Sequence, residues 1–339
     1  MSSTPYADQP AAPTLADTAA NGPPSAVLDT SVEPEDFDTF WKQTIDDTRT
    51  EPADLTCQPQ LTPLHSLTVE NITFPGYAAQ PVYGWLITPN AVTGALPVIV
   101  QYAGYGDGRG DPLQHLLWAS CGYAHFIMDN RGQGEDTPDP LPYGGVPAGG
   151  SDSAHVTRGI TDPASYYYRR LITDAVRAVD CLPLHPRINP DRVVLAGASQ
   201  GGGLALAAAA LSHGAAALLC DIPFMTAWRH ATHTADRGPY ADIAALCRSG
   251  RINTATVFAT LAYFDGRSFA ARAAIPALFS VALMDRVCPP STGQAAYTAY
   301  AGPKELLTYE FNDHQGGGLT HTAHQLAFLD NLFRTRRAH

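Results

Sequence analysis

The sequence contains few charged residues and no long run of positive charge. Only 16% of its 339 residues are charged, against about 25% in a typical soluble protein, whereas 45% are hydrophobic. Lysine and arginine number 21, and aspartate and glutamate number 32, so the net charge is −11 at neutral pH. A protein that follows a nucleic-acid backbone needs a positive face, which disfavours nucleic acid as the main partner. The low charge content instead favours self-association.

Cysteine motifs, targeting signals and long apolar runs are also missing. The six cysteines are scattered without a CxxC pair, so we expect buried thiols in a reducing compartment rather than a disulfide framework. Residues 1–34 contain no lysine or arginine and no apolar signal core. The longest stretch of small apolar residues, 201–220, is interrupted by Ser212, His213 and Gly214. The sequence therefore predicts a cytoplasmic protein that has no membrane partner.

What is present divides the chain into a tail and one large domain. Residues 1–34 are rich in proline, alanine, serine and threonine, which is typical of a flexible tail. Phe37, Phe40 and Trp41 then recur at helical spacing and indicate an amphipathic helix at the domain edge. We expect residues 35–339 to form a single domain.

Short apolar runs rich in β-branched residues predict eight strands. The first two alternate polar with apolar residues, as half-exposed antiparallel strands do, and the later ones are continuous apolar runs, as strands covered on both faces are. Most later gaps are long enough for a crossover helix, so the fold class is α/β, with a mostly parallel sheet and helices on both faces. The predicted strands cover residues 67–74, 82–88, 97–102, 123–128, 192–197, 216–221, 277–283 and 306–311.

Two segments are too long for simple connections, and one helix has a clear start signal. Residues 134–161 form a stretch rich in glycine, proline and aspartate, which predicts an extended loop or interface arm. Residues 225–272 contain short helical patterns, which we interpret as a small helical cap over the sheet. Between them, Asp162 as N-cap and Pro163 as first residue predict the start of an amphipathic helix.

A glycine-flanked turn carries the strongest chemical signal. The pattern GxSxG at residues 197–201 directly follows the predicted strand 192–197 and precedes a helix that opens with small residues. In a nucleophile elbow the serine occupies a strained strand-to-helix turn, which closes only between small neighbours. The following helix directs its amides toward the place where an oxyanion would form. The pattern predicts Ser199 as a nucleophile; the alternative is an ordinary glycine-rich turn.

A serine hydroxyl needs a base, and the base needs an acid that orients it. In this type of fold the acid and the histidine follow the serine in that order. Asp285 and His314 each lie just after a predicted strand, so we assign them as acid and base in preference to His321 and His324.

Two backbone amides are predicted to form the oxyanion hole. One belongs to Gln200, directly after the nucleophile, and the other comes from the glycine-rich loop after the third predicted strand, where we place it at Tyr105.

The same loop invites a dinucleotide-binding interpretation, with Asp129 as the ribose ligand. The spacing fails, because Arg109 or Asp111 would occupy the third glycine position. The HxxH pairs at residues 230–233 and 321–324 lack the glutamate of a zinc-binding HExxH motif. We therefore expect no cofactor and no metal.

Several separated motifs together resemble carbohydrate esterase family 7, the acetyl xylan esterases and cephalosporin C deacetylases of the α/β-hydrolase superfamily. The resemblance covers residues 35–335. It implies a serine carboxylesterase that removes acetyl groups from acetylated sugars, xylo-oligosaccharides or cephalosporin-type alcohols, with Ser199, Asp285 and His314 as triad and Tyr105 and Gln200 as oxyanion donors. The motifs are residues 131–133, 166–170, 197–201, 263–266, Asp285 with 288–292, and the His314 segment.

The resemblance also implies a homohexamer with active sites facing an inner cavity, and residues 134–161 would form its intersubunit arm. Arg131 and Gln133 are expected to support the site. One position departs from the family, because Gln315 stands where a glutamate follows the histidine. We expect it to change local hydrogen bonding and not to abolish activity.

The acyl pocket and the natural substrate are less well determined by the sequence. Phe224, Pro239 and Val287 are predicted to line a narrow acyl pocket, with ordinary core positions as the alternative. The functional alternatives are a peptidase or amidase on the same triad, a deacetylase of a natural-product intermediate, and a catalytically inactive scaffold.

Overall fold

The computed structural model describes residues 32–134, 136–140 and 154–335. The predicted tail therefore lies outside the described residues except for its last three positions, and so does half of the predicted arm at 134–161. All six cysteines are free thiols: three are buried, Cys57 and Cys247 are half-buried, and Cys121 is exposed. The prediction of buried thiols therefore holds for only half of them.

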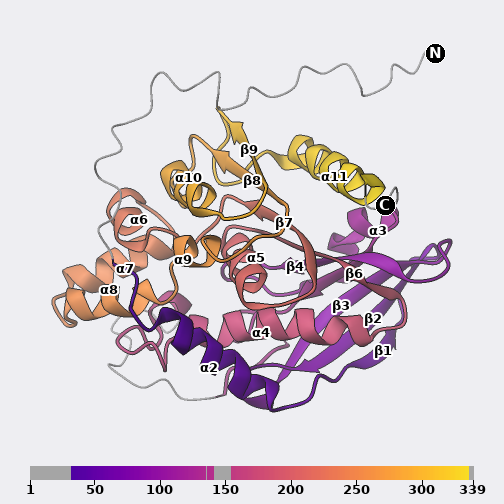
Figure 1. The fold of residues 1–339 in the computed structure, drawn as a ribbon, viewed down its shortest axis with the longest axis horizontal. Coiled ribbons are helices and arrows are strands. Elements are labelled where there is room, and N and C mark those ends of the chain that lie inside the picture. The colour runs from indigo at the N-terminus through magenta and orange to yellow at the C-terminus, as the bar shows by residue number, and fades with distance from the viewer. Residues whose placement is uncertain (1–31, 135, 141–153, 336–339) are drawn as a thin grey trace.

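The core of the molecule is one nine-stranded sheet in the order β1-β2-β3-β5-β4-β6-β7-β8-β9 (Figure 1). The pairs β1–β2, β2–β3 and β3–β5 are antiparallel, and the others are parallel. The strands are β1 (Thr56–Gln60), β2 (Leu67–Pro75), β3 (Pro81–Pro89), β4 (Leu96–Tyr102), β5 (Ala124–Met128), β6 (Ile188–Ala198), β7 (Ala215–Asp221), β8 (Ala277–Ala282) and β9 (Lys304–Tyr309).

The predicted α/β fold class is confirmed, and all eight predicted strands are present. The count of eight was one strand short, because β1 has the polar sequence TCQPQ and shows no regular burial pattern. It pairs only with β2, and an edge position of this kind tolerates Pro59, which has no N–H to donate.

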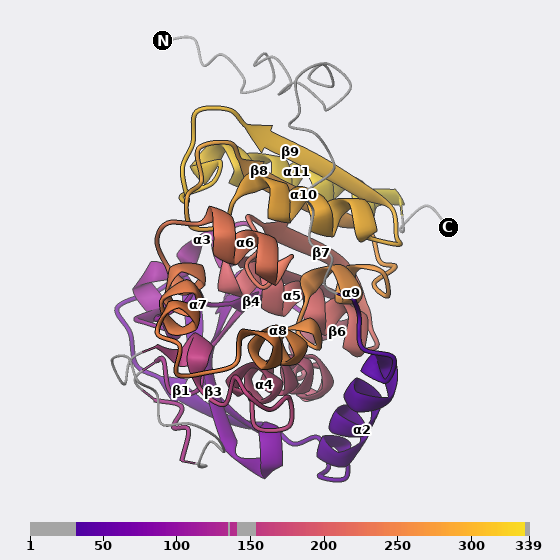
Figure 2. The same ribbon diagram turned by 90° about the vertical axis from the view of Figure 1, so that its left-hand side faces the viewer.

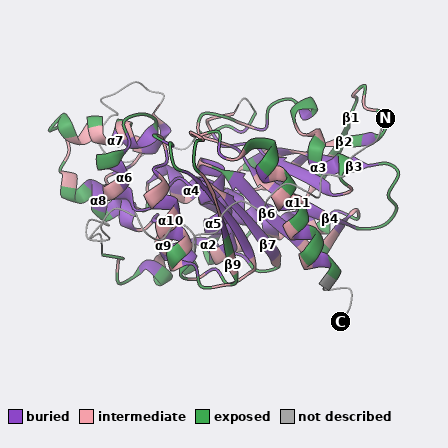
Figure 3. Cartoon of the chain, turned by 90° about the horizontal axis from the view of Figure 1, so that it is seen from above, coloured by how far each residue is buried: buried purple, intermediate pink, exposed green. Residues whose placement is uncertain are grey.

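Helices cover both faces of the sheet, as the continuous apolar strands require. Along β4, Val98 and Val100 join the core beneath α2, α4 and α5, whereas Ile99 joins the core beneath α3 and α11. Figure 3 shows the strands buried between these layers. The helices on the two faces are α2 (Phe37–Arg49), α4 (Tyr167–Cys181) and α5 (Gln200–Leu211), opposed by α3 (Leu116–Ser120) and α11 (Gly318–Thr335). Among the described residues, no helix combines the length and the apolar character that crossing a membrane requires.

The start of α4 differs from its prediction. The helix begins at Tyr167, five residues after the expected N-cap Asp162. The Asp162 carboxylate instead accepts hydrogen bonds from the Ala164 N–H at 3.0 Å and the Ser165 hydroxyl at 2.7 Å. These bonds stabilise a separate turn, which is the other structure that aspartate followed by proline favours.

Residues 225–272 form helices, as the cap interpretation expected. These helices lie between β7 and β8 in sequence and group at one end of the sheet (Figure 1); they face the viewer in Figure 2. They are α6 (Trp228–Thr234), α7 (Pro239–Arg248), α8 (Thr254–Ala262) and α9 (Gly266–Ala270). The helix α10 (Pro290–Ala299) follows β8.

The strand order creates a natural site at β4. This strand lies between β5 and β6, so the chain leaves it toward one side of the sheet and later returns on the other. Ligands of open α/β sheets bind at such a switch point, beyond the carboxyl ends of the strands. Tyr102 at the end of β4 pairs in register with Gly197 near the end of β6. The loop after β4 therefore lies beside Ser199.

Candidate active site

Ser199 occupies a strained turn between β6 and α5. Its φ of 56° and ψ of −120° are rare for a residue with a side chain. A Cβ atom at Gly197 would lie 2.2 Å from the carbonyl carbon of Gly201, and one at Gly201 would lie 2.0 Å from the carbonyl oxygen of Tyr102. Both positions therefore require glycine, and the turn has the backbone of a nucleophile elbow.

Hydrogen bonds on both sides hold the Ser199 backbone in this conformation. Its N–H donates to the Asp221 carbonyl at 3.0 Å, and its carbonyl accepts the Phe224 N–H at 2.9 Å. The Ser199 Oγ atom lies 3.8 Å from the Sγ atom of Cys288, which is almost fully buried. Because Cys288 follows Asp285 by three residues, this contact brings the loop of the predicted acid next to the predicted nucleophile.

Asp285 and His314 form a hydrogen-bonded pair. The distance between His314 Nδ1 and Asp285 Oδ2 is 2.9 Å, and the Asp285 carboxylate is completely buried. Its other oxygen accepts the N–H groups of Val287 at 2.8 Å and Cys288 at 2.9 Å. A carboxylate held in this way accepts the Nδ1 proton and leaves Nε2 as the basic nitrogen. The His314 side chain remains 32% exposed.

Tyr105 lies in the loop after β4, and Gln200 is the first residue of α5, directly after Ser199. Among the described residues, the backbone N–H groups of Tyr105 and Gln200 have no hydrogen-bond acceptor. The Tyr105 side chain points elsewhere, because its hydroxyl accepts the Val156 N–H at 3.0 Å. Burial, the main cause, raises the pKa of this hydroxyl to about 12. Tyr105 can therefore contribute its backbone amide to the site while its side chain anchors the loop.

Gln133, which was expected to support the site, makes contacts that the sequence did not reveal. Its Oε1 atom accepts the Gly106 N–H at 2.6 Å, next to Tyr105. Its Nε2 atom donates to the Gln200 Oε1 atom at 2.9 Å and to the Tyr167 hydroxyl at 2.7 Å. One side chain thus joins the loop after β4 to the elbow.

Arg131 anchors the turn after β5 that carries Gln133. Its guanidinium is fully buried and pairs with both oxygens of Asp174 on α4, at 2.5 and 2.7 Å. The Arg131 carbonyl accepts the Tyr167 hydroxyl at 2.6 Å. Its position two residues before Gln133 was visible in the sequence, but its distant partner was not.

The three predicted acyl-pocket residues lie on three different segments and differ in burial. Phe224 is fully buried, with its ring 4.4 Å from that of Tyr240 and 6.4 Å from that of Tyr105. Pro239 is buried at the start of α7, and Val287 is half-buried in the loop after β8. Their contact with an acyl group stays a prediction.

The competing histidines have other surroundings. His321 is buried and bonds to the Asp221 carboxylate at 2.6 Å and to the Tyr309 hydroxyl at 2.9 Å. These bonds fasten α11 to the sheet. His324 borders a separate groove between α11 and β9.

One group of possible metal ligands, Cys57, Glu70 and His185, occurs among the described residues. His185 Nδ1 accepts the Arg187 N–H at 3.2 Å, so the ring proton is on Nε2, which lies 3.1 Å from the Glu70 carboxylate. A metal at Nε2 would have to displace that proton. The bonding is therefore that of an ordinary histidine–glutamate pair.

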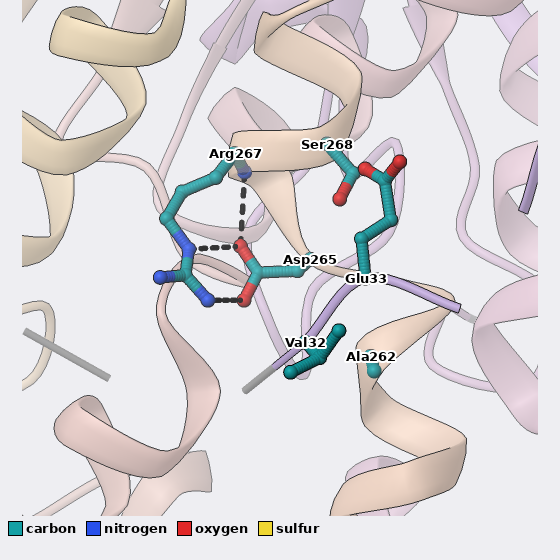
Figure 4. A pocket seen from close by; sticks show the side chains of 6 residues that line it. All are labelled: Val32, Glu33, Ala262, Asp265, Arg267 and Ser268. Carbon is teal, nitrogen blue, oxygen red and sulfur yellow. Dashed lines mark hydrogen bonds and ion pairs between the residues drawn. The ribbon is translucent and has the colours of Figure 1, made fainter. Parts of the chain in front are cut away.

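A cavity of about 220 Å³ lies beside the first described residues (Figure 4). Its lining includes Asp265 and Arg267, which pair with each other at 2.9 Å within one turn. It includes neither Ser199, Asp285 nor His314, so we do not assign it to the reaction.

A serine on a strained strand-to-helix turn, with an acid and a histidine on the loops after later strands, defines an α/β-hydrolase. The family model of acetyl xylan esterase (AXE1) matches residues 28–332. The chain belongs to this family, whose members are carboxylic ester hydrolases.

Individual relatives agree with this assignment. The structure of an acetyl xylan esterase from Paenibacillus sp. R4 is 36% identical, with a TM-score of 0.83 over 89% of this chain and 96% of that one. Acetyl xylan esterase 1 from Thermoanaerobacterium sp. JW/SL YS485 is 28% identical, with a TM-score of 0.81 over 90% of this chain and 96% of that one. The acetyl esterase Axe7A of Xylanibacter ruminicola is 27% identical over 83% of this chain, which spans 63% of the length of that relative.

Proposed function

We propose that the protein is a serine esterase that releases acetate from small acetylated substrates, with Ser199, His314 and Asp285 as catalytic triad. The observation that carries the proposal is the elbow serine in the same site as a buried carboxylate bonded to an imidazole. Membership of the acetyl xylan esterase family supports acetylated xylo-oligosaccharides as the substrate class. Acetate esters of cephalosporin-type alcohols and acetylated natural products are further candidates, because they too release an alcohol as the leaving group.

The reaction proceeds in two steps. His314 Nε2 takes the Ser199 proton as Oγ attacks the acetyl carbon, and the amides of Tyr105 and Gln200 stabilise the oxyanion. The imidazolium then gives its proton to the alcohol oxygen as the ester bond breaks. Water attacks the acetyl-enzyme, His314 takes the proton of the water, and acetate leaves as Ser199 regains its proton.

The test is hydrolysis of p-nitrophenyl acetate and butyrate by the wild type and by Ser199→Ala. We expect the variant to lose roughly 10⁴-fold or more in kcat, because no nucleophile remains. Ser120→Ala, which removes an exposed serine on α3, is the matched control and should keep full activity. Serine-independent acetate release would contradict the proposal.

A peptidase or amidase is the rival on the same triad. Acetyl-p-nitroanilide distinguishes it, because an amide has a poorer leaving group and the esterase should cleave it far more slowly than the acetate ester. Comparable rates on both substrates would favour the rival. Released acetate from acetylated xylo-oligosaccharides and cephalosporin C then identifies the alcohol.

We also propose a homohexamer in the cytoplasm. The low charge content of the chain supports association. Sedimentation velocity tests the assembly, and a monomer at micromolar concentration would contradict it. Cell fractionation tests the location.

A further inference from the structure

Two consecutive residues of the cap pair with the two loops that carry the proposed acid and base. In the connection between α6 and α7, Arg237 Nη2 lies 2.5 Å from Asp313 Oδ2, and Asp236 forms an ion pair with Arg286. Asp313 directly precedes His314, and Arg286 directly follows Asp285. We call these four residues, Asp236, Arg237, Arg286 and Asp313, the clasp.

Asp313 connects the cap to the backbone of the base. While its Oδ2 atom pairs with Arg237, its Oδ1 atom accepts the His314 N–H at 2.8 Å. The His314 amide and then the Arg237 guanidinium hold the pKa of this carboxyl below its ordinary value, so it is charged at neutral pH. A single carboxylate thus links a cap side chain to the residue that must face Ser199.

Packing places the clasp in close contact with the same loops. Gly238 has a φ of +74°, and a Cβ atom there would lie 2.8 Å from a methyl group of Val287. Nearby, His230 on α6 bonds to Ser291 at the start of α10 at 2.8 Å. The cap therefore touches the segment that follows Asp285 at several points.

Among the described residues, the other hydrogen bonds of the His314 loop are made within the loop or, like the His314–Asp285 bond, to the loop of Asp285. Asn312 Nδ2 donates to the Gly316 carbonyl at 2.8 Å, which closes the loop on itself. The Met284 N–H donates to the Asn312 carbonyl at 3.1 Å, which joins this loop to that of Asp285. Neither bond reaches the cap, so the clasp connects this loop to a part of the molecule that these bonds do not reach.

We infer that Arg237 and Asp313 are positioning residues that hold the His314 loop against the cap and so keep the imidazole aligned with Ser199. The inference rests on the proposed function, because it needs His314 as the base. Beyond the proposed function, the inference says that the cap contributes to catalysis through the Arg237–Asp313 ion pair and that salt weakens this contribution. The side chains of Arg237 and Asp313 are 49% and 40% exposed, so dissolved ions reach the pair.

A double-mutant cycle tests the inference. Arg237→Gln removes the cation, and Asp313→Asn removes the charge but keeps an oxygen for the His314 N–H. We expect each variant to lose about two- to five-fold in kcat on p-nitrophenyl acetate at low salt, with KM little changed, which is the range that an exposed ion pair supplies. The double variant should lose no more than either single variant. Arg237→Lys should retain most of the activity, because it keeps the charge.

Salt and a remote pair provide the controls. Wild-type kcat should approach that of the double variant in 0.5 M NaCl, while kcat of the double variant should not change. The exposed pair Arg334–Asp330 on α11 is the matched control, so Arg334→Gln and Asp330→Asn should have no effect on kcat. Multiplicative losses in the double variant, or unchanged single variants, would overturn the inference.

Hydrogen–deuterium exchange separates the inference from the proposed function. Peptides covering residues 283–288 and 311–316 should exchange faster in both single clasp variants than in the wild type or the control variants. This readout does not depend on which residue is the nucleophile. If Ser199→Ala remains active while exchange rises as expected, the proposed function fails and so does the catalytic role of the clasp, although the clasp still holds the two loops. If exchange does not change, the clasp is refuted whatever the activity.

Discussion

The two halves of the site are built by opposite means. On the nucleophile side, Ser199 and the loop after β4 are held by the hydrogen bonds of Gln133, by backbone contacts that only glycine permits, and by the enclosed Arg131–Asp174 pair. On the acid–base side, His314 lies on a partly exposed loop that surface charges connect to the cap. Asp285 and Cys288 are deeply buried there.

This difference can be related to the part that each half plays in the proposed reaction. In the proposed mechanism the oxyanion hole must be in place before charge develops, which suits donors held next to a turn that only glycine permits. In the proposed mechanism the imidazole accepts and returns a proton in each step, and it lies on a loop that is partly exposed. We therefore expect mutations of the buried groups on the nucleophile side to have larger effects, on stability and on rate, than mutations of the exposed groups on the acid–base side.

The largest effect should come from breaking the buried ion pair. Arg131→Met leaves the Asp174 carboxylate buried without its cation, and we expect a loss of about 3 to 5 kcal/mol in the free energy of unfolding. Urea denaturation measures it. Arg334→Met, which breaks an exposed pair, should change stability by less than about 1 kcal/mol. Equal effects of the two substitutions would remove the contrast between buried and surface pairing.

Acid should lower the stability of the fold through His125, a buried histidine on β5. Burial, the main cause, lowers the pKa of this histidine on β5 to about 4, whereas the unfolded chain titrates near 6.5. The unfolded state therefore binds the extra proton first, and stability should fall as pH drops from about 6.5 to about 4, by up to about 3 kcal/mol. Urea unfolding over this pH range should show a shallower fall in His125→Gln. Parallel curves for the two proteins would assign the acid sensitivity to other groups.

A smaller effect is expected from Gln133, which joins the two parts of the nucleophile side. Gln133→Ala should lower kcat roughly 10- to 100-fold, because Gly106 and Gln200 lose a shared partner worth about 1 to 3 kcal/mol. Gln315→Ala is the counterpart on the other side. Its side chain is exposed, and we expect less than a two-fold change. Steady-state kinetics on p-nitrophenyl acetate measure both effects. A larger loss of kcat in Gln315→Ala than in Gln133→Ala would contradict the comparison.

Signals local in sequence predicted most of the fold and the placement of the main site residues. The elbow was recognisable because strand, turn and helix are contiguous and the glycines have a steric reason. Asp285 and His314 were recognisable because each follows a strand. Their mutual bond follows from the parallel order of β8 and β9.

Features that depend on distant partners were not predictable. The strand β1 exists only because β2 offers it an edge, and its own residues are polar. The Asp162 signal was real, but nothing in the sequence distinguished a turn from a helix start. Gln133 and Arg237 find their partners through tertiary contacts with residues 67 and 76 positions away. No local pattern marks such pairs.

The insertion of the cap between neighbouring strands has a practical consequence for protein engineering. The chain leaves the sheet after Asp221 and returns at Ala277 on the adjacent strand, so replacing the four cap helices would keep the strand order, provided that Trp228 and Phe269 still fill the core that they share with α4 and α5. A graft that preserves residues 236–238 would keep the junction with the histidine loop. Substrate range and turnover could then be selected separately in one scaffold.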